Sequence, residues 1–147
     1  MPKSARKPVD LGVLEGFVGF HLRVAQIQVF RDFEQALAEQ GVTPASFSVL
    51  EVLRANPGAT QSRLAHAVHL DRSSVVPLLD KLEQRGLLQR RASTTDRRNN
   101  HIVLTATGLE LLASATARVR EHEKRMTRRM SAAQKKSLIG LLGKVGG

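Results

Sequence analysis

The chain has 147 residues, the size of one domain or of one domain with dimerising arms. Apolar residues make up 41% and charged residues 24%, which is ordinary for a globular protein and argues against disorder of the whole chain. The excess of 23 Lys and Arg over 13 Asp and Glu gives a formal charge of +10, which indicates a polyanionic partner. Because the chain has no cysteine, disulfides, thiolate zinc sites and cysteine nucleophiles are excluded.

Hydrophobic and aromatic residues narrow the class of partner. No apolar run approaches the ~18–20 residues of a membrane span, and the basic start lacks the apolar stretch of a signal peptide, so we expect a cytoplasmic protein. All five Phe lie between residues 17 and 47, and Trp and Tyr are absent. Single-strand and RNA binders need exposed rings on which bases stack. The positive charge therefore favours duplex DNA over a membrane surface.

The first part of the chain predicts an arm and a long helix. Residues 1–9 are expected to form a flexible basic arm. Asp10 is the expected N-cap of one helix running to about Gln40, with Gly41 as its terminator. Apolar residues cover so much of this helix that it cannot lie on the surface of a small monomer. We therefore expect it to cross a dimer interface.

The rest of the chain predicts further helices and one hairpin. The helices are expected to begin at five N-cap residues, Thr43 (followed by Pro44), Thr60, Asp71, Thr105 and Ser131. The helix after Thr43 is expected to end near Asn56, the helix after Thr60 before the turn at His69, and the helix after Asp71 at Gly86. The helix after Thr105 is expected to run to about Met130. Residues 87–92 and 101–104 are β-compatible and flank a polar, turn-rich segment, which predicts a hairpin.

A helix-turn-helix pattern lies between Thr60 and Gly86. Ala65 is small enough for a close helix crossing, and Val75 is a β-branched residue suited to the core. His69 occupies the turn position where Gly is usual, and His tolerates a positive φ better than most residues. A predicted hairpin with Arg97 and Arg98 at its tip follows, so the pattern predicts a winged helix-turn-helix.

Two segments resemble the MarR family of dimeric winged helix-turn-helix transcriptional regulators. They are LDRSSVVPLLDKLEQRGLL (70–88) and DRRNNHIVLTATG (96–108), the second of which matches the family's Asp-x-Arg…Leu-Thr-x-x-Gly signature. The resemblance covers about residues 10–145. It implies a mainly α fold with a small β-wing: a winged helix-turn-helix region at 41–104 and helical dimerisation regions at 10–40 and 105–147. It further implies a homodimeric repressor released by a small ligand.

The same resemblance implies which residues contact DNA. The recognition helix beginning at Asp71 is expected to enter the major groove, and Arg98 the minor groove, with Asp96 holding Arg98. Pro77 stands where family members often have Arg, and its ring could touch a thymine methyl. The full expected set is Thr60, Gln61, Ser62, Arg72, Ser73, Ser74, Pro77, Asp96, Arg97 and Arg98. A solvated arginine and a serine at a helix start are the ordinary alternatives, and Arg85, Arg90 and Arg91 are expected to be solvated or to face phosphate.

The resemblance also implies an effector cleft where the dimerising helices meet the winged region. Aromatic and cationic residues at the expected cleft suggest an aromatic carboxylate or its coenzyme A thioester, and they are Phe17, Phe20, His21, Arg23, Phe30 and Phe47. A buried cation needs an anion, which would be the ligand. The alternative is that Arg23 pairs with an acid across the dimer, such as Glu15 or Asp32, or reaches solvent.

Other functions lack a constellation that could carry them. No metal-ligand spacing and no Gly-rich phosphate loop is present, so we expect no enzyme, no metal and no cofactor. The basic segment 118–136 is either a site for phosphate or an anionic ligand, or a solvated helix face. An architectural or constitutive DNA-binding protein without an effector remains the alternative to a regulator.

Overall fold

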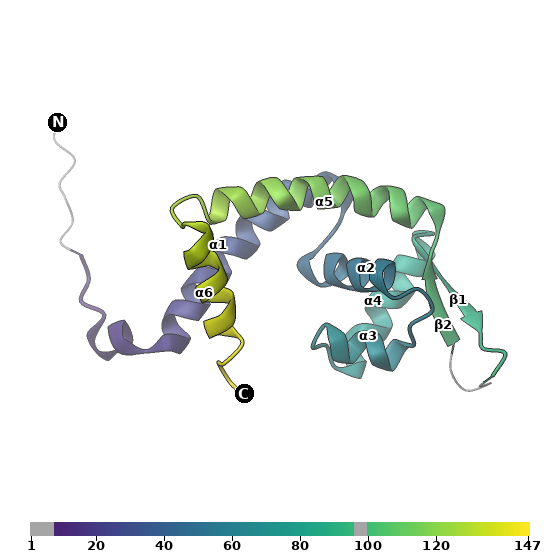
Figure 1. Ribbon diagram of the computed structural model, residues 1–147, viewed down its shortest axis with the longest axis horizontal. Helices are drawn as coiled ribbons and strands as arrows, with labels where there is room; N and C mark the ends of the chain where they lie inside the picture. Colours follow the sequence, from purple (N-terminus) through teal and green to yellow (C-terminus); the bar gives the residue numbers. More distant parts are fainter. Residues whose placement is uncertain (1–7, 96–99) are drawn as a thin grey trace.

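The computed structural model describes residues 8–95 and 100–147. Its elements in chain order are η1 (Gly12–Gly16), α1 (Val18–Leu37), η2 (Ala38–Gln40), α2 (Pro44–Ala55), α3 (Gln61–Ala67), α4 (Arg72–Gln84), β1 (Leu88–Ala92), β2 (Asn100–Leu104), α5 (Ala106–Met126) and α6 (Ala132–Leu142). Figure 1 shows α2, α3, α4 and the hairpin gathered at one end, with α5 running from them to α1 and α6 at the other. We refer to residues 41–104 as the winged lobe, and to residues 8–40 and 105–147 as the arm.

Side-chain caps set the helix starts. Each of the five predicted N-cap side chains accepts a hydrogen bond from the backbone N–H three residues later, and these residues are Thr43, Thr60, Asp71, Thr105 and Ser131. This bond satisfies one of the N–H groups that a helix start leaves free. The five starts are confirmed, although α5 ends at Met126 rather than near Met130.

The prediction of one continuous helix from Asp10 to Gln40 is wrong. Asp10 Oδ1 accepts a bond of 2.8 Å from Gly12 N, at the start of the short 3-10 helix η1, whose N-cap residue is Leu11 rather than Asp10. Phe17 is extended at φ −100° and ψ 118°, and α1 begins after it, so α1 is about 30 Å long. Gly12, which has a positive φ, and Gly16 both weaken a helix at this place. The predicted terminator Gly41 is confirmed by its left-handed φ of 60°.

The hydrophobic core lies within the winged lobe and under the start of α5. Its members come from every element of the lobe, and they include Leu50, Leu53, Leu64, Val75, Leu79, Leu88, Ile102 and Leu112. A second, smaller cluster joins α1 to the lobe, and in it the rings of Phe33 and Phe47 meet edge to face at 6.1 Å between centroids. The lobe is therefore a packed unit to which one end of α1 is attached.

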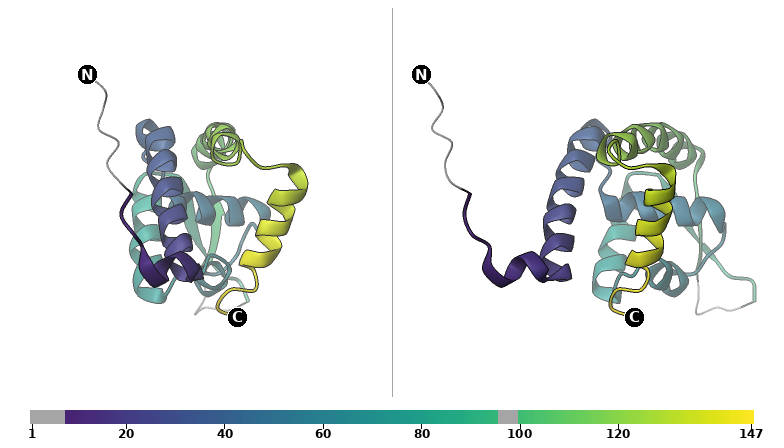
Figure 2. Two further views of the ribbon diagram at one scale, coloured as in Figure 1. Left: turned by 90° about the vertical axis from the view of Figure 1, so that its left-hand side faces the viewer. Right: turned by 60° about the vertical axis from the view of Figure 1, so that its left-hand side comes forward.

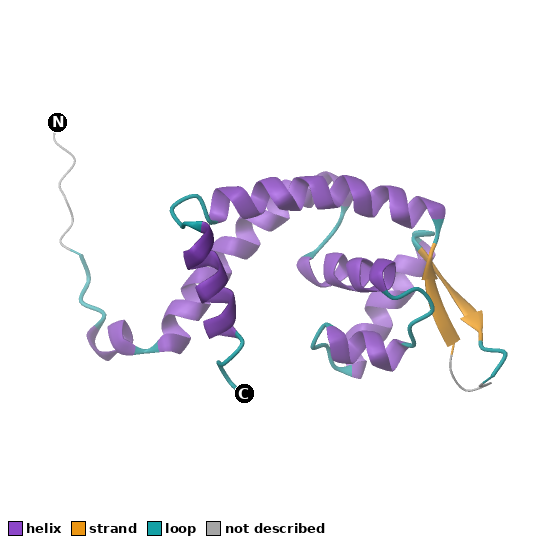
Figure 3. Ribbon diagram, viewed as in Figure 1, coloured by secondary structure: helices purple, strands orange, loops and turns teal. Residues whose placement is uncertain are grey.

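The hairpin predicted for the wing is confirmed. Strands β1 and β2 are antiparallel, with Leu88 opposite Leu104 and Ala92 opposite Asn100; Figure 3 shows them as the two strands at the far end of the lobe. Ile102 also bonds to the segment between α2 and α3, donating from N to Ala59 O at 3.0 Å and accepting from Gly58 N at 2.9 Å. The base of the wing is thus fastened to the lobe by backbone hydrogen bonds.

The arm presents many apolar side chains to solvent. In the single chain Val13 is 73% exposed, Phe17 57% and Ile139 70%. Figure 1 shows α1 and α6 apart from the lobe, and Figure 2 shows η1 at the end of α1. Within the described ranges, none of the helices is both long and apolar enough to cross a membrane. A membrane-spanning helix within these ranges therefore does not explain the apolar surface of the arm.

Candidate nucleic-acid interface

The turn between α3 and α4 has the geometry of a helix-turn-helix. His69 adopts φ 54°, as predicted for this position. Leu70 N donates to Ala65 O at 2.9 Å, which closes the turn behind α3. Val75 is 1% exposed and anchors α4 in the core. The remaining face of the first turn of α4 points to solvent.

That first turn carries three of the predicted DNA-binding residues. Arg72, Ser73 and Ser74 are all exposed. Asp71 Oδ1 accepts bonds from Ser73 Oγ at 2.7 Å and from Ser74 N at 2.8 Å. These bonds, that from the Ser73 hydroxyl first, hold the pKa of the Asp71 carboxyl below its usual value. Arg72 is the residue of this turn whose side chain has no protein partner among the described residues.

Pro77 lies inside α4 and is exposed, and the helix continues through it from Arg72 to Gln84. Proline has no N–H, so the carbonyl of Ser73 loses its usual helical donor. The exposed ring of Pro77 is apolar, so the side chain at position 77 offers van der Waals contact and no hydrogen bond.

A hollow of about 450 Å³ joins α3, α4 and the wing. Its lining includes Gln61 and Ser62 of α3, Arg72 of α4, and Arg90 and Asn100 of the wing. Three of these were predicted to contact DNA. Thr60, the N-cap of α3, lies beside them, with its Oγ1 3.2 Å from Ser62 Oγ. The structure thus brings the start of α3 and the start of α4 to one polar, basic concavity.

The remaining predicted contacts, Asp96, Arg97 and Arg98, lie outside the described residues. The strands that lead to them end at Ala92 and begin again at Asn100.

Three further arginines, Arg85, Arg90 and Arg91, were predicted to be solvated or to face phosphate. The side chain of Arg90 is 19% exposed, and its guanidinium bonds to Glu83 and, at 2.7 Å, to Asp80, both on α4. Arg85 donates to the carbonyl oxygens of Gln40 and Gly41 at 2.7 and 2.8 Å. Arg90 is half-buried and ion-paired, so the prediction that it is solvated or faces phosphate is wrong. Arg85 is exposed, as predicted, although its terminal nitrogens bond to the protein. Arg91 is exposed, as predicted.

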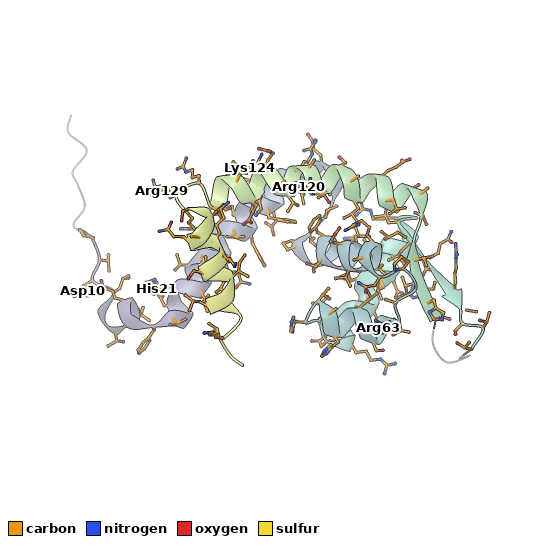
Figure 4. The ribbon with its side chains drawn as sticks, in the orientation of Figure 1. Asp10, His21, Arg63, Arg120, Lys124 and Arg129 are labelled. Carbon is orange, nitrogen blue, oxygen red and sulfur yellow. The ribbon has the colours of Figure 1, made fainter. Side chains whose placement is uncertain are left out.

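Sequence reasoning missed Arg63 as a candidate contact. It is exposed in the first turn of α3, and Figure 4 shows it on the side of the lobe away from α5. Arg63 follows directly after Thr60, Gln61 and Ser62, which were singled out for phosphate. Its place in the same helical turn was the signal that could have identified it.

The six residues predicted to bind an effector do not meet in one chain. Phe17, His21 and Arg23 are exposed on the arm, where His21 Nε2 bonds to the Glu15 carbonyl at 2.8 Å. Phe20 is half-buried beside His21, and Phe30 is 42% exposed farther along α1. Phe47 is half-buried against Phe33 in the lobe. Figure 4 shows His21 far from Arg63 and the lobe.

Asp32, one of the two acids suggested as alternative partners for Arg23, is engaged elsewhere. Asp32 Oδ2 lies 2.6 Å from His122 Nδ1 and 2.8 Å from Arg125 Nη2, both on α5 of the same chain. These partners, Arg125 foremost, lower the pKa of Asp32. His122 is 3% exposed and its ring meets Phe33 edge to face at 5.4 Å. This cluster is the hydrogen-bonded joint between α1 and α5.

The basic segment 118–136 has a mixed environment. Arg118 pairs with Glu39 at 3.2 Å, and Lys124 pairs with Glu121 at 2.8 Å, both at the surface. Figure 4 shows Lys124 and Arg129 near the end of α5 and in the turn after it, away from Arg63. Arg120 of α5 lines a hollow with Glu51 and Arg54 of α2. This segment is therefore separate from the concavity between α3, α4 and the wing.

Comparison with known proteins shows what the chain is similar to. The MarR family profile matches residues 42–99. A protein of Thauera aromatica, named as a transcriptional regulatory protein for the hcr operon, is 41% identical over 132 residues, which are 89% of this chain and 80% of the relative.

Two solved structures of the transcriptional repressor CouR have the same fold. One, bound to a 23-mer DNA duplex, is 37% identical with a TM-score of 0.90, over 96% of this chain and 100% of CouR. The other, bound to p-coumaroyl-CoA, is 36% identical with a TM-score of 0.84, over 94% and 97%. Together with the winged helix-turn-helix geometry, these likenesses place the chain in the MarR family of DNA-binding transcriptional regulators.

Proposed function

We propose that this protein is a cytoplasmic, homodimeric repressor that binds a pseudo-palindromic DNA operator and is released by a small anionic aromatic ligand. The observation that carries the DNA-binding part is the basic concavity in which the starts of α3 and α4 meet the wing. The proposal includes no catalytic activity, metal or cofactor.

Each predicted contact has a physical role in this proposal. Arg72, at the start of α4, has no hydrogen-bond or ion-pair partner within residues 8–95 and 100–147, and an arginine can donate two hydrogen bonds to guanine in the major groove. Thr60, Gln61, Ser62 and Arg63 bind phosphate, while Ser73 and Ser74 contact bases or phosphates and Pro77 a thymine methyl. At the wing tip, we propose that Arg98, with Arg97 and Asp96 beside it, enters the minor groove, where a narrow A/T-rich groove attracts arginine.

The homodimer accounts for the apolar arm. MarR-family regulators are dimeric, and we propose that residues 10–40 and 105–147 form the dimerisation region. The side chains that would be covered include Val13, Phe17, Ile139 and Leu141, all more than half exposed in the single chain. A dimer also presents two copies of α4 to two half-sites about one helical turn apart.

The effector part of the proposal rests on residues that a second protomer would bring together. Apolar walls and a cation for an aromatic carboxylate or its coenzyme A thioester are offered by Phe17, just before α1, by Phe20, His21, Arg23 and Phe30 of α1, and by Phe47 of α2. CouR, 36% identical over nearly all of this chain, has been solved with p-coumaroyl-CoA. An aromatic acyl-CoA is therefore the first ligand to test.

Operator binding is tested by selecting duplexes from a random library with the purified protein, followed by titration at several salt concentrations. We expect a pseudo-palindromic consensus, two protomers per site, and a log–log salt slope of about −0.9 for each neutralised phosphate. Binding of one protomer per site would overturn the dimeric operator. Binding without any consensus would favour an architectural DNA-binding protein.

Effector release is tested by adding p-coumaroyl-CoA, p-coumarate or coenzyme A to the complex with the selected duplex. Arg23→Ala is expected to keep operator affinity and melting temperature but to need at least tenfold more ligand for release, since a charge-assisted hydrogen bond contributes about 1.5–3 kcal/mol. Arg31→Ala, which removes a second exposed cation from α1, is the matched control. Release of the Arg23 variant at the wild-type ligand concentration would contradict the proposed role. A loss of dimer stability instead would indicate that Arg23 pairs across the interface.

A further inference from the structure

Arg85 connects the end of the recognition helix to the end of α1. It directly follows α4 as its C-cap residue, and its two terminal nitrogens donate to consecutive carbonyl oxygens, Nη1 to Gly41 at 2.8 Å and Nη2 to Gln40 at 2.7 Å. The last carbonyls of a helix have no helical N–H to bond, and a cation is favoured at that end. The Arg85 guanidinium therefore caps the carbonyl end of the α1–η2 segment, and this capping group comes from the lobe.

This contact is the direct polar tie between the recognition helix and the first helical segment of the arm. Among the described residues, no other hydrogen bond or ion pair joins α4 or its C-cap to α1, η2 or Gly41. The ring contact of Phe33 with Phe47 also joins α1 to the lobe, but apolar packing is non-directional. Two parallel hydrogen bonds from one planar group fix an orientation as well as a distance.

The position of Arg85 gives it leverage over the DNA-reading end of α4. Arg72 lies at the opposite end of the helix, thirteen residues away, which is about 20 Å at 1.5 Å per residue. A swing of about 10° around the corner between α1 and α2 would move Arg72 by ~3.5 Å, close to the ~3.4 Å rise of one base pair. A small loosening at Arg85 would thus change which half-site spacing the dimer fits.

We propose that Arg85 is a positioning residue that fixes the winged lobe relative to the arm and thereby determines the half-site spacing that the protein accepts. The inference rests on the dimer of the proposed function. Because both terminal nitrogens are committed to Gln40 and Gly41, Arg85 acts on spacing without contributing to base reading.

The DNA test uses the duplex selected by the wild-type protein and two derivatives with one base pair inserted or removed at its centre. We expect the wild type to lose at least tenfold in affinity on either derivative, and Arg85→Ala and Arg85→Lys to lose threefold or less. Lysine keeps the charge but cannot bond both carbonyls in this geometry. The proposal would be overturned if Arg85→Lys distinguished the three duplexes as strongly as the wild type does. It would also be overturned if both variants bound each of the three duplexes more weakly than the wild type by the same factor.

A second measurement needs no DNA. The chain has no cysteine, so Ala67→Cys, exposed at the end of α3, takes a single nitroxide label per protomer, and electron–electron double resonance reports the distance between the two lobes. We expect a broader distance distribution when Arg85→Ala or Arg85→Lys is added. Arg129→Ala, which removes a cation far from the lobe (Figure 4), should leave it unchanged.

The two measurements separate this inference from the function on which it rests. If no duplex is selected, DNA binding fails while the distance measurement still tests Arg85. If no distance between two labels is found because the protein is monomeric, the dimer of the proposed function is excluded. A dimer whose distance distribution is as narrow in both Arg85 variants as in the wild type would overturn the positioning role.

Discussion

The winged lobe and the arm differ in how they bury their apolar residues. In the lobe Leu50, Leu64 and Leu79 are completely buried, and they come from three different helices. In the arm Phe17, Ile139 and Leu141 are more than half exposed, although the arm contains the longest helices of the chain. The lobe has a core of its own, whereas much of the arm's apolar surface needs a second molecule.

The difference has an energetic scale. Burying one large aliphatic or aromatic side chain contributes about 1.5–3 kcal/mol, so a few such residues on each protomer suffice for a stable dimer. The lobe gains this contribution within one chain. If the arm forms the proposed dimer interface, its folding and association are linked, and its stability depends on protein concentration. Changes in the two regions should therefore be distinguishable by experiment.

The largest effect is expected from breaking the dimer. Leu141→Asp places a charge on the apolar surface of α6, where Leu141 is 58% exposed in the single chain. We expect monomers in sedimentation equilibrium and a loss of operator affinity of about 1,000-fold, because a monomer loses the avidity of two linked half-sites, which reaches ~10²–10⁴. Ala55→Asp adds the same charge to an exposed position of α2, outside the proposed dimerisation region, and is the control. A dimeric Leu141→Asp variant would contradict the assignment of α6 to the interface.

A second large effect is expected where the lobe joins the arm. A Cβ added at Gly108 would lie 2.0 Å from the carbonyl oxygen of Leu87. The two backbone segments cannot move apart freely, because Thr105 Oγ1 donates to the carbonyl oxygen of Gly86, next to Leu87, and accepts a hydrogen bond from Gly108 N. We expect Gly108→Ala to lower the free energy of unfolding by ~3 kcal/mol, measured by urea denaturation.

The control for this substitution lies in the arm. A Cβ at Gly140 of α6 meets nothing within 4 Å in the single chain, so Gly140→Ala should be neutral or stabilise by up to about 1 kcal/mol through helix propensity. Equal destabilisation by both alanines would mean that the dimer interface packs as tightly against Gly140 as Leu87 packs against Gly108.

Local features of the fold were predictable from sequence. An N-cap side chain bonds to a backbone group only three residues away, so Thr43, Asp71 and Thr105 could be recognised without knowledge of the tertiary structure. The break before α1 was missed because apolar periodicity was given more weight than Gly12 and Gly16. Periodicity reports which residues are covered, but it does not report whether the backbone between them is continuous.

The candidate site was predictable only in part, for the same reason. The start of α4 follows from the helix-turn-helix spacing, so Arg72 could be assigned. The hydrogen-bond partners of Arg85 and Arg90 could not be predicted in this way. Gly41 and Arg85, for example, are 44 residues apart, and no local sequence pattern links them. Likewise, the effector residues of α1 do not converge within one chain, so their assignment depends on a second protomer.

An intermediate effect is expected at the joint between α1 and α5. The pKa of Asp32 is lowered by Arg125 and His122, so ionised Asp32 stabilises the folded chain. Asp32→Asn should therefore cost about 1.5 kcal/mol at neutral pH. A group whose pKa is depressed by folding stabilises above its unfolded pKa, near 3.9 for Asp, and the contribution is lost as the pH falls through the folded value. The difference between variant and wild type should shrink below about pH 4 in denaturant titrations; a difference independent of pH would exclude an ionic role.

The smallest effect is expected inside the lobe, at the helix-turn-helix turn. His69 has φ 54°, a left-handed conformation that costs an L-residue roughly 1–2 kcal/mol, whereas glycine adopts it freely. Part of this gain is offset because glycine has more conformational freedom in the unfolded chain, so His69→Gly should stabilise by ~0.5–1 kcal/mol. Gly41→Ala, at φ 60°, is the reciprocal control and should destabilise by about 1 kcal/mol. Since His69 is exposed, operator affinity should change less than twofold. A destabilised His69→Gly variant would show that the imidazole makes a contact in the dimer or with DNA that outweighs the strain of its backbone.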